Sequence, residues 1–221
     1  MHSHLTSVSH QLSSRTHSRV ALRGIYAIIN EGQRDPLRLT RAVLSGGVRI
    51  VQYRAKAGVV PAHALGIRDL CREAGALFIV NDDAAVAQEL GADGVHAGPE
   101  DRAWREPRLV RALIGDKLLG LSCASAEQAV YAQKLGADYL GVGSCFTTLS
   151  KPDAGTPIGL NGLREVARAT SLPVAAVGGI TAENIAQVAS CGVAMAAVVS
   201  ALCVDDPAAA ARALTRLWNG R

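Results

Sequence analysis

An amide and two cationic side chains occupy every second position from residue 52 to residue 56. Gln52, Arg54 and Lys56 follow the apolar residues Ile50 and Val51. In an extended chain residues spaced by two share one face, because successive side chains alternate. Guanidinium and ammonium groups on one face suit a polyanionic ligand. An ordinary charged loop is the alternative interpretation of these residues taken alone.

Aspartates follow two other apolar runs. Asp82 and Asp83 come after a run that ends at Val80, and Asp101 follows a later run. We interpret Asp83 as the cap of the next helix, which leaves Asp82 to face the same site as Asp101. Two carboxylates near the cationic side chains of Arg54 and Lys56 predict a Mg²⁺ ion that is bound by oxygen ligands and shared with a pyrophosphate. Either aspartate alone would also fit a turn or a helix cap.

Glycines and a serine follow the last two apolar runs. Gly178 and Gly179 follow one run, and Val199 and Ser200 belong to the end of the other. Paired glycines let the backbone approach an anion, and a helix N-terminus after them offers N–H groups. In (β/α)8 barrels the loops after strands seven and eight are the usual phosphate site. We therefore predict that these four residues bind phosphate.

A long connection runs from Gly141 to about Gly159 before the next predicted helix. Connections of this length are usually lids or binding loops. The hydroxyls of Thr148 and Ser150 and the ammonium group of Lys151 would close over phosphate oxygens. A disordered surface loop is the alternative.

Histidine and cysteine contribute little to the predicted chemistry. His96 has apolar neighbours and is interpreted as a hydrogen-bonded structural residue rather than a general base. The five cysteines are widely spaced without a CxxC pair, which favours a reduced cytoplasmic protein over a zinc site or a disulfide framework. Cys123 and Cys145 have no adjacent histidine to activate them, so we leave both out of catalysis.

The elements that position these residues alternate between apolar strands and Ala/Leu/Arg/Glu-rich helices. Such alternation predicts a parallel sheet with right-handed crossovers, and eight units in about 200 residues fit a single (β/α)8 TIM barrel. A doubly wound sheet is the alternative. The predicted strands are 24–29, 48–52, 77–80, 93–96, 118–121, 138–142, 173–177 and 193–199. The predicted helices are 36–46, 61–74, 83–90, 106–113, 125–135, 160–170, 182–190 and 206–218.

Composition limits the domain organisation and the partners. The net charge is +4, and residues 1–30 carry three arginines and no acid, so the rest is nearly neutral. This argues against a nucleic-acid-binding surface, and no apolar run is long enough for a transmembrane helix. Residues 1–20 are predicted to form a disordered tail, with an organellar transit peptide as the alternative. Residues 21–221 are predicted to form the barrel.

Seven motifs at the predicted strand ends resemble the thiamine-phosphate synthase family. The resemblance spans about residues 24–215. The motifs are Gln-x-Arg-x-Lys at 52–56, Asn-Asp at 81–82, His-x-Gly-x-Glu-Asp at 96–101, Gly-x-Ser at 120–122, Thr-x-Ser-Lys-Pro at 148–152, Gly-Gly-Ile at 178–180 and Val-Ser-Ala at 199–201.

The resemblance implies a transferase that couples hydroxymethylpyrimidine pyrophosphate with thiazole phosphate, giving thiamine phosphate and pyrophosphate through a dissociative, Mg²⁺-assisted step. It implies that Asp82 and Asp101 hold the metal and that Gln52 contacts the pyrimidine. The residues implied to bind pyrophosphate, with Ser122 close by, are Arg54, Lys56, Asn81 and Lys151. The residues implied to hold the thiazole phosphate are Thr148, Ser150, Gly179, Val199 and Ser200.

Two other functions compete with this interpretation. A related thiazole tautomerase has a similar barrel but relies on a histidine near the position of Ala124. The absence of that histidine from this chain favours the synthase. A non-catalytic phosphate-binding barrel would not need Asp82 and Asp101. The expected partners are small phosphorylated substrates, and a homo-oligomer is compatible with the sequence.

Overall fold

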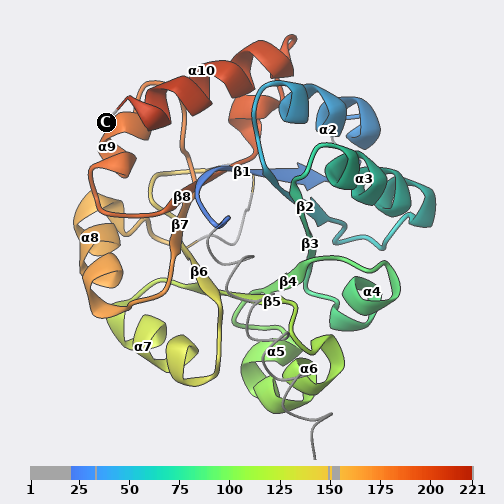
Figure 1. Cartoon of the computed structure of the whole chain (residues 1–221). Coiled ribbons are helices and arrows are strands. Elements are labelled where there is room, and N and C mark those ends of the chain that lie inside the picture. Colours follow the sequence, from blue (N-terminus) through green and yellow to red (C-terminus); the bar gives the residue numbers. More distant parts are fainter. Residues whose placement is uncertain (1–20, 33, 149, 151–154, 221) are drawn as a thin grey trace, which may run out of the picture.

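Eight parallel strands close into a barrel with helices outside it, so the predicted (β/α)8 TIM barrel is confirmed (Figure 1). This computed structural model describes residues 21–32, 34–148, 150 and 155–220. The predicted tail, residues 1–20, and the predicted site residue Lys151 lie outside the described residues.

The elements follow the predicted order along the chain. The strands are β1 (Gly24–Asn30), β2 (Ile50–Arg54), β3 (Leu77–Asn81), β4 (Gly94–Ala97), β5 (Leu118–Cys123), β6 (Tyr139–Gly143), β7 (Val174–Val177) and β8 (Met195–Val198). The helices are α2 (Pro36–Ser45), α3 (Pro61–Glu73), α4 (Ala84–Glu89), α5 (Arg102–Arg105), α6 (Pro107–Ile114), α7 (Ala126–Lys134), α8 (Gly159–Ala169), α9 (Ile185–Ala189), the short 3-10 helix η1 (Ser200–Leu202) and α10 (Pro207–Asn219).

Each strand pairs with its neighbours in the chain, and β1 also pairs with β8 to close the barrel. Tyr26 registers with Ile50 on one side and with Ala197 on the other. On the outside of this seam α10 packs against α2. The two helices approach closely at Gly46, where a Cβ atom would lie 2.7 Å from the carbonyl oxygen of Ala208.

The barrel has an apolar layer outside its strands and a smaller cluster inside. Alternate strand residues supply the two layers, as the period of two requires. On β2, Val51 and Tyr53 belong to the outer layer, whereas Ile50 belongs to the inner cluster. Gln52 and Arg54 have the same parity as Ile50, so they point inward above it. This confirms the expected alternation of this segment.

Most elements begin or end within one to three residues of the predicted bounds, and two differences have a clear physical reason. The second strand is Ile50–Arg54 rather than 48–52, because the ladder with β1 begins at Ile50. Arg49 before it uses its guanidinium group to bond the carbonyl of Leu44 at 3.1 Å. The extra helix α5 precedes α6, and Pro107 at the first position of α6 separates them. Within the described residues, the helices are all too short or too polar to span a bilayer.

Candidate active site

A cavity of about 270 Å³ lies at the carboxyl ends of the strands, and all eight strands contribute to its lining. Nearly all the predicted site residues surround it, although they come from distant parts of the chain. The predicted residues that line it are Gln52, Arg54, Lys56, Asn81, Asp82, Asp101, Ser122, Thr148, Ser150, Gly178, Gly179, Val199 and Ser200. Their individual roles stay predictions.

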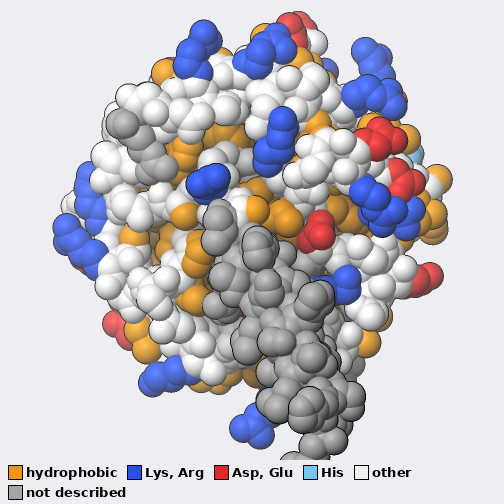
Figure 2. All heavy atoms as spheres, viewed as in Figure 1, with side chains coloured by type: hydrophobic (Ala, Val, Ile, Leu, Met, Phe, Trp, Pro, Cys, Tyr) orange, Lys and Arg blue, Asp and Glu red, His pale blue; other side chains and the backbone are white. Residues whose placement is uncertain are grey.

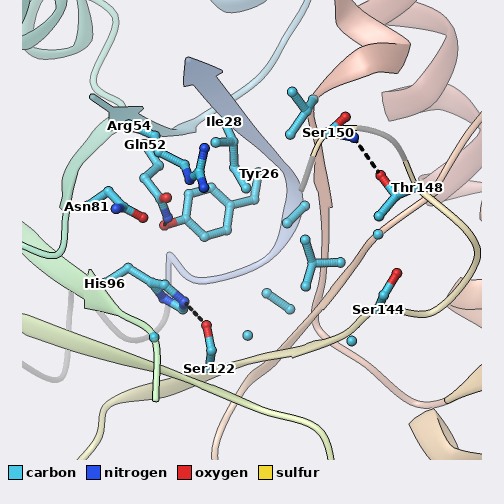
Figure 3. Close-up of a pocket in the computed structure, with 18 of the residues that line it drawn as sticks. Tyr26, Ile28, Gln52, Arg54, Asn81, His96, Ser122, Ser144, Thr148 and Ser150 are labelled. Atoms are coloured by element: carbon cyan, nitrogen blue, oxygen red, sulfur yellow. Dashed lines mark hydrogen bonds between the residues drawn. The ribbon is translucent and has the colours of Figure 1, made fainter. Parts of the chain in front are cut away.

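The cavity has two polar sides (Figure 3). Gln52, Arg54 and Asn81 lie on one side, and Thr148 and Ser150 lie on the other. Ile28 lies between the two sides in this view, and Ala175 and Val177 also contribute apolar lining. A site with two polar ends and an apolar middle suits two anionic groups joined through flat, apolar rings.

Two cations converge on the first polar side. The guanidinium group of Arg54 donates to Asn30 Oδ1 at 3.3 Å, which fixes its direction across the β1–β2 ladder. Lys56 lies just beyond β2 and forms an ion pair with Asp82. Half of the Lys56 side chain is exposed, so its ammonium group remains accessible to a ligand in the cavity.

Asp82 and Asp101 come together from the loops after β3 and β4, and their carboxyl groups share a hydrogen bond. Burial and that bond to Asp82 raise the pKa of Asp101. Burial also acts to raise the pKa of Asp82, but the hydrogen bonds from Asp101 and Lys56 outweigh it and hold the pKa below its usual value. Of the two carboxyl groups, Asp101 is therefore the one that takes up a proton first as the pH falls.

Local backbone geometry aims these two carboxyls. Asp82 adopts a left-handed conformation with φ of 65°, which aspartate tolerates better than most residues. Its N–H donates to the carbonyl of His96 at 2.7 Å. Asp101 Oδ2 accepts from the N–H of Gly98 at 2.6 Å. As predicted, Asp83 caps the next helix by accepting from the N–H groups of Ala85 and Val86.

The second polar side is built from the loops after β6, β7 and β8. The N–H of Ser150 donates to Thr148 Oγ1 at 3.2 Å. Gly178 and Gly179 both have positive φ. The N–H groups of Gly179 and Ile180 have no acceptor among the described residues, so they are available to an anion.

The two glycines also serve a purpose that the sequence analysis did not anticipate. A Cβ at Gly179 would lie 2.6 Å from the carbonyl oxygen of Thr147, and one at Gly178 would meet Ser144. They therefore let the β6 and β7 loops pack together. The expected role of a following helix N-terminus is not supported, because α9 begins only at Ile185 and the N–H of Thr181 is already bonded to Asn184 Oδ1.

His96 lies in the floor of the cavity and is hydrogen-bonded, as predicted. Its ring nitrogens bond Tyr139 Oη at 3.1 Å and Ser122 Oγ at 3.0 Å. The sequence analysis missed Tyr26, Asn30 and Tyr139. An available signal was the spacing by two of Tyr26, Ile28 and Asn30, which places all three on the inner face of β1.

The cysteines stay outside the chemistry. All five are free, and none lines the cavity. Burial raises the pKa of Cys123 to about 12 and that of Cys145 to about 11, which keeps both thiols protonated at neutral pH. Figure 2 shows one face of the molecule, on which Lys and Arg are spread out among acidic residues rather than gathered in a single patch.

Comparisons with known proteins point to one family. The family model described as thiamine monophosphate synthase matches residues 25–202. The chain is 44% identical over 200 residues to the thiamine-phosphate synthase of Chloroflexus aurantiacus, covering 87% of this chain and 91% of that protein. It is 45% identical over 203 residues to that of Roseiflexus castenholzii, covering 87% of each. The structure of thiamine phosphate pyrophosphorylase from Pyrococcus furiosus superposes with a TM-score of 0.83 at 34% identity, covering 90% of this chain and 97% of that one.

Proposed function

The chain belongs to the thiamine monophosphate synthase family, and we propose how its cavity holds the two substrates of that family's reaction. The protein is a transferase that couples hydroxymethylpyrimidine pyrophosphate with thiazole phosphate to give thiamine phosphate and pyrophosphate. The observation that carries our assignment is the separation of the two polar sides of one cavity. The cations and paired aspartates lie on one side, and the hydroxyls and glycines lie on the other.

We assign the leaving pyrophosphate to the side with Arg54 and Lys56. Charge develops on the pyrophosphate as its bond to the pyrimidine methylene breaks, so fixed cations there stabilise the transition state more than the ground state. Asn81 lies on the same side, and Ser122 lies in the floor of the cavity next to His96. Both can donate hydrogen bonds to the pyrophosphate. We place Lys151 there too, on the strength of the family motif.

The paired aspartates fit a Mg²⁺ ion. Asp82 and Asp101 are hard oxygen ligands whose carboxyl groups lie against each other, and a divalent cation between them would favour the ionised form of both. Mg²⁺ in proteins is usually held by one or two carboxylates together with substrate phosphates and water. When bound, it would neutralise charge on the leaving pyrophosphate.

We assign the thiazole phosphate to Thr148, Ser150, Gly179, Val199 and Ser200. This phosphate does not change its charge during the reaction. Backbone N–H groups and hydroxyls are therefore enough to anchor it, and no cation is required there.

The proposed step breaks the carbon–oxygen bond first. The electron pair leaves with the pyrophosphate, a cation stabilised by the pyrimidine remains, and the lone pair of the thiazole nitrogen forms the new carbon–nitrogen bond. No proton has to move, which fits a site without a general base. Ile28, Ala175 and Val177 in the middle of the cavity would exclude water, which would otherwise capture the cation.

The direct test is to incubate the protein with both phosphorylated substrates and Mg²⁺. We expect thiamine phosphate and pyrophosphate in equal amounts, and no product when either substrate is omitted. Absence of thiamine phosphate from folded protein would refute the proposed function.

Two substitutions test the division of the cavity. Lys151→Ala should lower kcat as well as kcat/KM, because a contact to developing charge is lost. Ser200→Ala should mainly raise the KM for thiazole phosphate. If Lys151→Ala changed only that KM, the lysine would belong with the second substrate.

Location and assembly are also proposals. The five free cysteines support a reducing compartment, which favours the cytoplasm. A homo-oligomer and the absence of nucleic-acid binding stay predictions, to be measured by light scattering and by a filter-binding assay.

A further inference from the structure

We propose that five side chains in the floor of the cavity form one directional hydrogen-bond chain that links pyrimidine recognition to the leaving group. The chain runs from Gln52 through Tyr26, Tyr139 and His96 to Ser122. Tyr26, Tyr139 and His96 act as positioning residues that make Ser122 a hydrogen-bond donor toward the pyrophosphate. This inference rests on the proposed function, because it uses the two substrate ends assigned above.

The contacts are continuous across the barrel. Gln52 Nε2 donates to Tyr26 Oη at 2.7 Å, and Tyr26 Oη lies 2.9 Å from Tyr139 Oη. Tyr139 Oη lies 3.1 Å from His96 Nδ1, and His96 Nε2 lies 3.0 Å from Ser122 Oγ. Figure 3 shows Tyr26 between Gln52 and the centre of the cavity, with the His96–Ser122 bond below. The two ends of the chain belong to the cavity, whereas Tyr139 does not line it.

Burial forces each link to have a direction. The side chains of Tyr26 and Tyr139 are almost wholly buried. Burial raises the pKa of both hydroxyls, so each keeps its single proton. A buried hydroxyl that fails to donate that proton incurs a desolvation penalty. Each tyrosine has one neighbour on each side within the chain, so each must accept from one and donate to the other.

When His96 is neutral, two arrangements satisfy every link, and their hydrogen bonds run in opposite directions. If the Gln52 amide donates to Tyr26, then Tyr26 donates to Tyr139, and Tyr139 donates to His96 Nδ1. His96 then carries its proton on Nε2 and donates to Ser122, whose own hydrogen turns to the cavity. If the Gln52 carbonyl faces Tyr26 instead, every bond reverses direction. Ser122 then donates its hydrogen to His96 Nε2 and cannot donate it to a ligand.

The orientation of one amide therefore sets the chemistry at a group on the far side of the floor. A donor group of the pyrimidine on Gln52 Oε1 would select the first arrangement, with Nε2 turned to Tyr26. Ser122 is then a donor at the moment when the pyrophosphate needs one. Without such a donor group, both arrangements are available and the contribution of Ser122 is diluted.

The barrel makes room for this chain at specific positions. The rings of His96 and Tyr139 lie 5.4 Å apart. A Cβ at Gly120 would clash with both rings, and a Cβ at Gly141 would lie 2.8 Å from His96 Cε1. Two strand positions that would normally carry side chains are thus left empty for the central pair, which indicates that the pair is built into the barrel.

Tyr139→Phe is the informative variant because it removes only an oxygen that no substrate can touch. We expect kcat to fall about five- to tenfold, the value of one net hydrogen bond, with the KM for thiazole phosphate unchanged. The matched control is Thr40→Val, which removes a fully buried hydroxyl bonded to the carbonyl of Pro36 at 2.7 Å, far from the cavity. It should leave kcat unchanged.

A double-mutant cycle with Ser122→Ala separates a positioning role from a structural one. We expect Ser122→Ala to lower kcat by about 10²-fold, as removal of a transition-state donor does. In that background Tyr139→Phe should have less than a twofold further effect, because it acts through Ser122. The proposal would be overturned if the loss of kcat in the double variant equalled the product of the two single losses, or if Tyr139→Phe left kcat unchanged.

A spectroscopic readout does not depend on activity. Long-range proton–nitrogen NMR of the ring-labelled protein distinguishes the two tautomers of His96. With the pyrimidine substrate bound we expect the proton on Nε2, and in Gln52→Glu, whose carboxylate can only accept from Tyr26, we expect it on Nδ1. The same tautomer in both samples would overturn the proposal. If the wild-type protein made no thiamine phosphate, the proposed function would fail. A shift from a mixture of tautomers in the free wild type to the Nδ1 tautomer in free Gln52→Glu would still report on the chain.

Discussion

Asp101→Asn isolates the charge of the proposed metal site from its shape. An asparagine can keep both hydrogen bonds of the aspartate. Its carbonyl can accept from the N–H of Gly98, as Oδ2 now does at 2.6 Å, and its amide can donate to Asp82 as the protonated carboxyl does. The substitution therefore imitates the protonated state and removes one of two negative charges from the site.

The expected loss is large because the charge is needed in the transition state. Loss of one electrostatic stabiliser of a developing anion lowers kcat by about 10²- to 10³-fold, or about 2.7–4 kcal/mol. Losing a charged ligand also weakens Mg²⁺ binding. We therefore expect Asp101→Asn to lower kcat/KM by about 10²-fold at saturating Mg²⁺ and to raise the Mg²⁺ concentration for half-maximal rate.

Although Asp101→Asn should lose activity, its folded state should be at least as stable as that of the wild type. The pKa of Asp101 is raised by burial and by Asp82, so ionising it in the folded state weakens the fold as the pH rises above the pKa of the unfolded chain. Asparagine cannot ionise. In EDTA at pH 8 the variant should therefore melt at or above the wild-type temperature, and this excess should vanish as the pH falls and Asp101 becomes protonated.

The assay is the initial rate of pyrophosphate release across a Mg²⁺ titration, paired with melting curves in EDTA. Asp83→Asn is the matched control, since Asp83 is the adjacent carboxylate and caps α4 without lining the cavity. Asparagine caps helices about as well as aspartate, so this control should behave as wild type. A rate and a Mg²⁺ dependence for Asp101→Asn within threefold of wild type would refute the metal assignment.

Three further predictions concern stability. Arg111→Met should cost about 3–5 kcal/mol in urea unfolding with kcat retained, because it removes the cation that lies 2.8 Å from the fully buried carboxylate of Asp138; a cost below 1 kcal/mol would contradict this. Gly120→Ala should cost about 1–3 kcal/mol by overpacking and lower kcat, because its Cβ would enter the His96 and Tyr139 rings; wild-type values would show that the rings can move aside. Hydrogen bonds from Tyr53 and His63 outweigh the effect of burial and lower the pKa of Glu31. Glu31→Gln should therefore lower the melting temperature near pH 7, and the deficit should shrink as the pH falls through that lowered pKa. A deficit independent of pH would show that these bonds do not stabilise the carboxylate of Glu31.

The sequence predicted most of the barrel because its signals are local. Each strand is a short apolar run that ends in polar residues, and each helix has a pattern of its own. The offset of β2 arose because Val48 is as apolar as Ile50, and only the pairing with Tyr26 shows where the ladder begins. Helix α5 was missed because it has only four residues.

The site was predicted at its rim better than at its floor. Residues such as Arg54 and Asp82 follow strands directly, so the general geometry of parallel barrels places them together. The link between Tyr26 and Tyr139 spans 113 positions, and no local pattern encodes it. In the sequence, Gly120 is the local sign of this link. Glycine at that position suggests only a weak strand, because the rings of His96 and Tyr139 that require it are known only from the structure.

The seam between β1 and β8 has a consequence for the order of folding. Adjacent strands elsewhere join residues about 25 apart, as Tyr26 and Ile50 do, whereas Tyr26 and Ala197 are 171 apart. Because closure entropy rises by about 0.6 kcal/mol per doubling of the loop, forming this seam first would cost about 1.7 kcal/mol more than forming an adjacent pair. We expect the seam to close last.

The cavity depends on that final event for part of its lining. Val199 and Ser200 follow β8, whereas Tyr26 and Asn30 are carried by β1. A chain that has assembled every strand except across the seam would be compact and rich in regular structure, yet it would have no complete cavity. Recovery of activity during refolding should therefore lag behind recovery of circular dichroism, and pulsed hydrogen exchange should show the amides of β1 and β8 protected last.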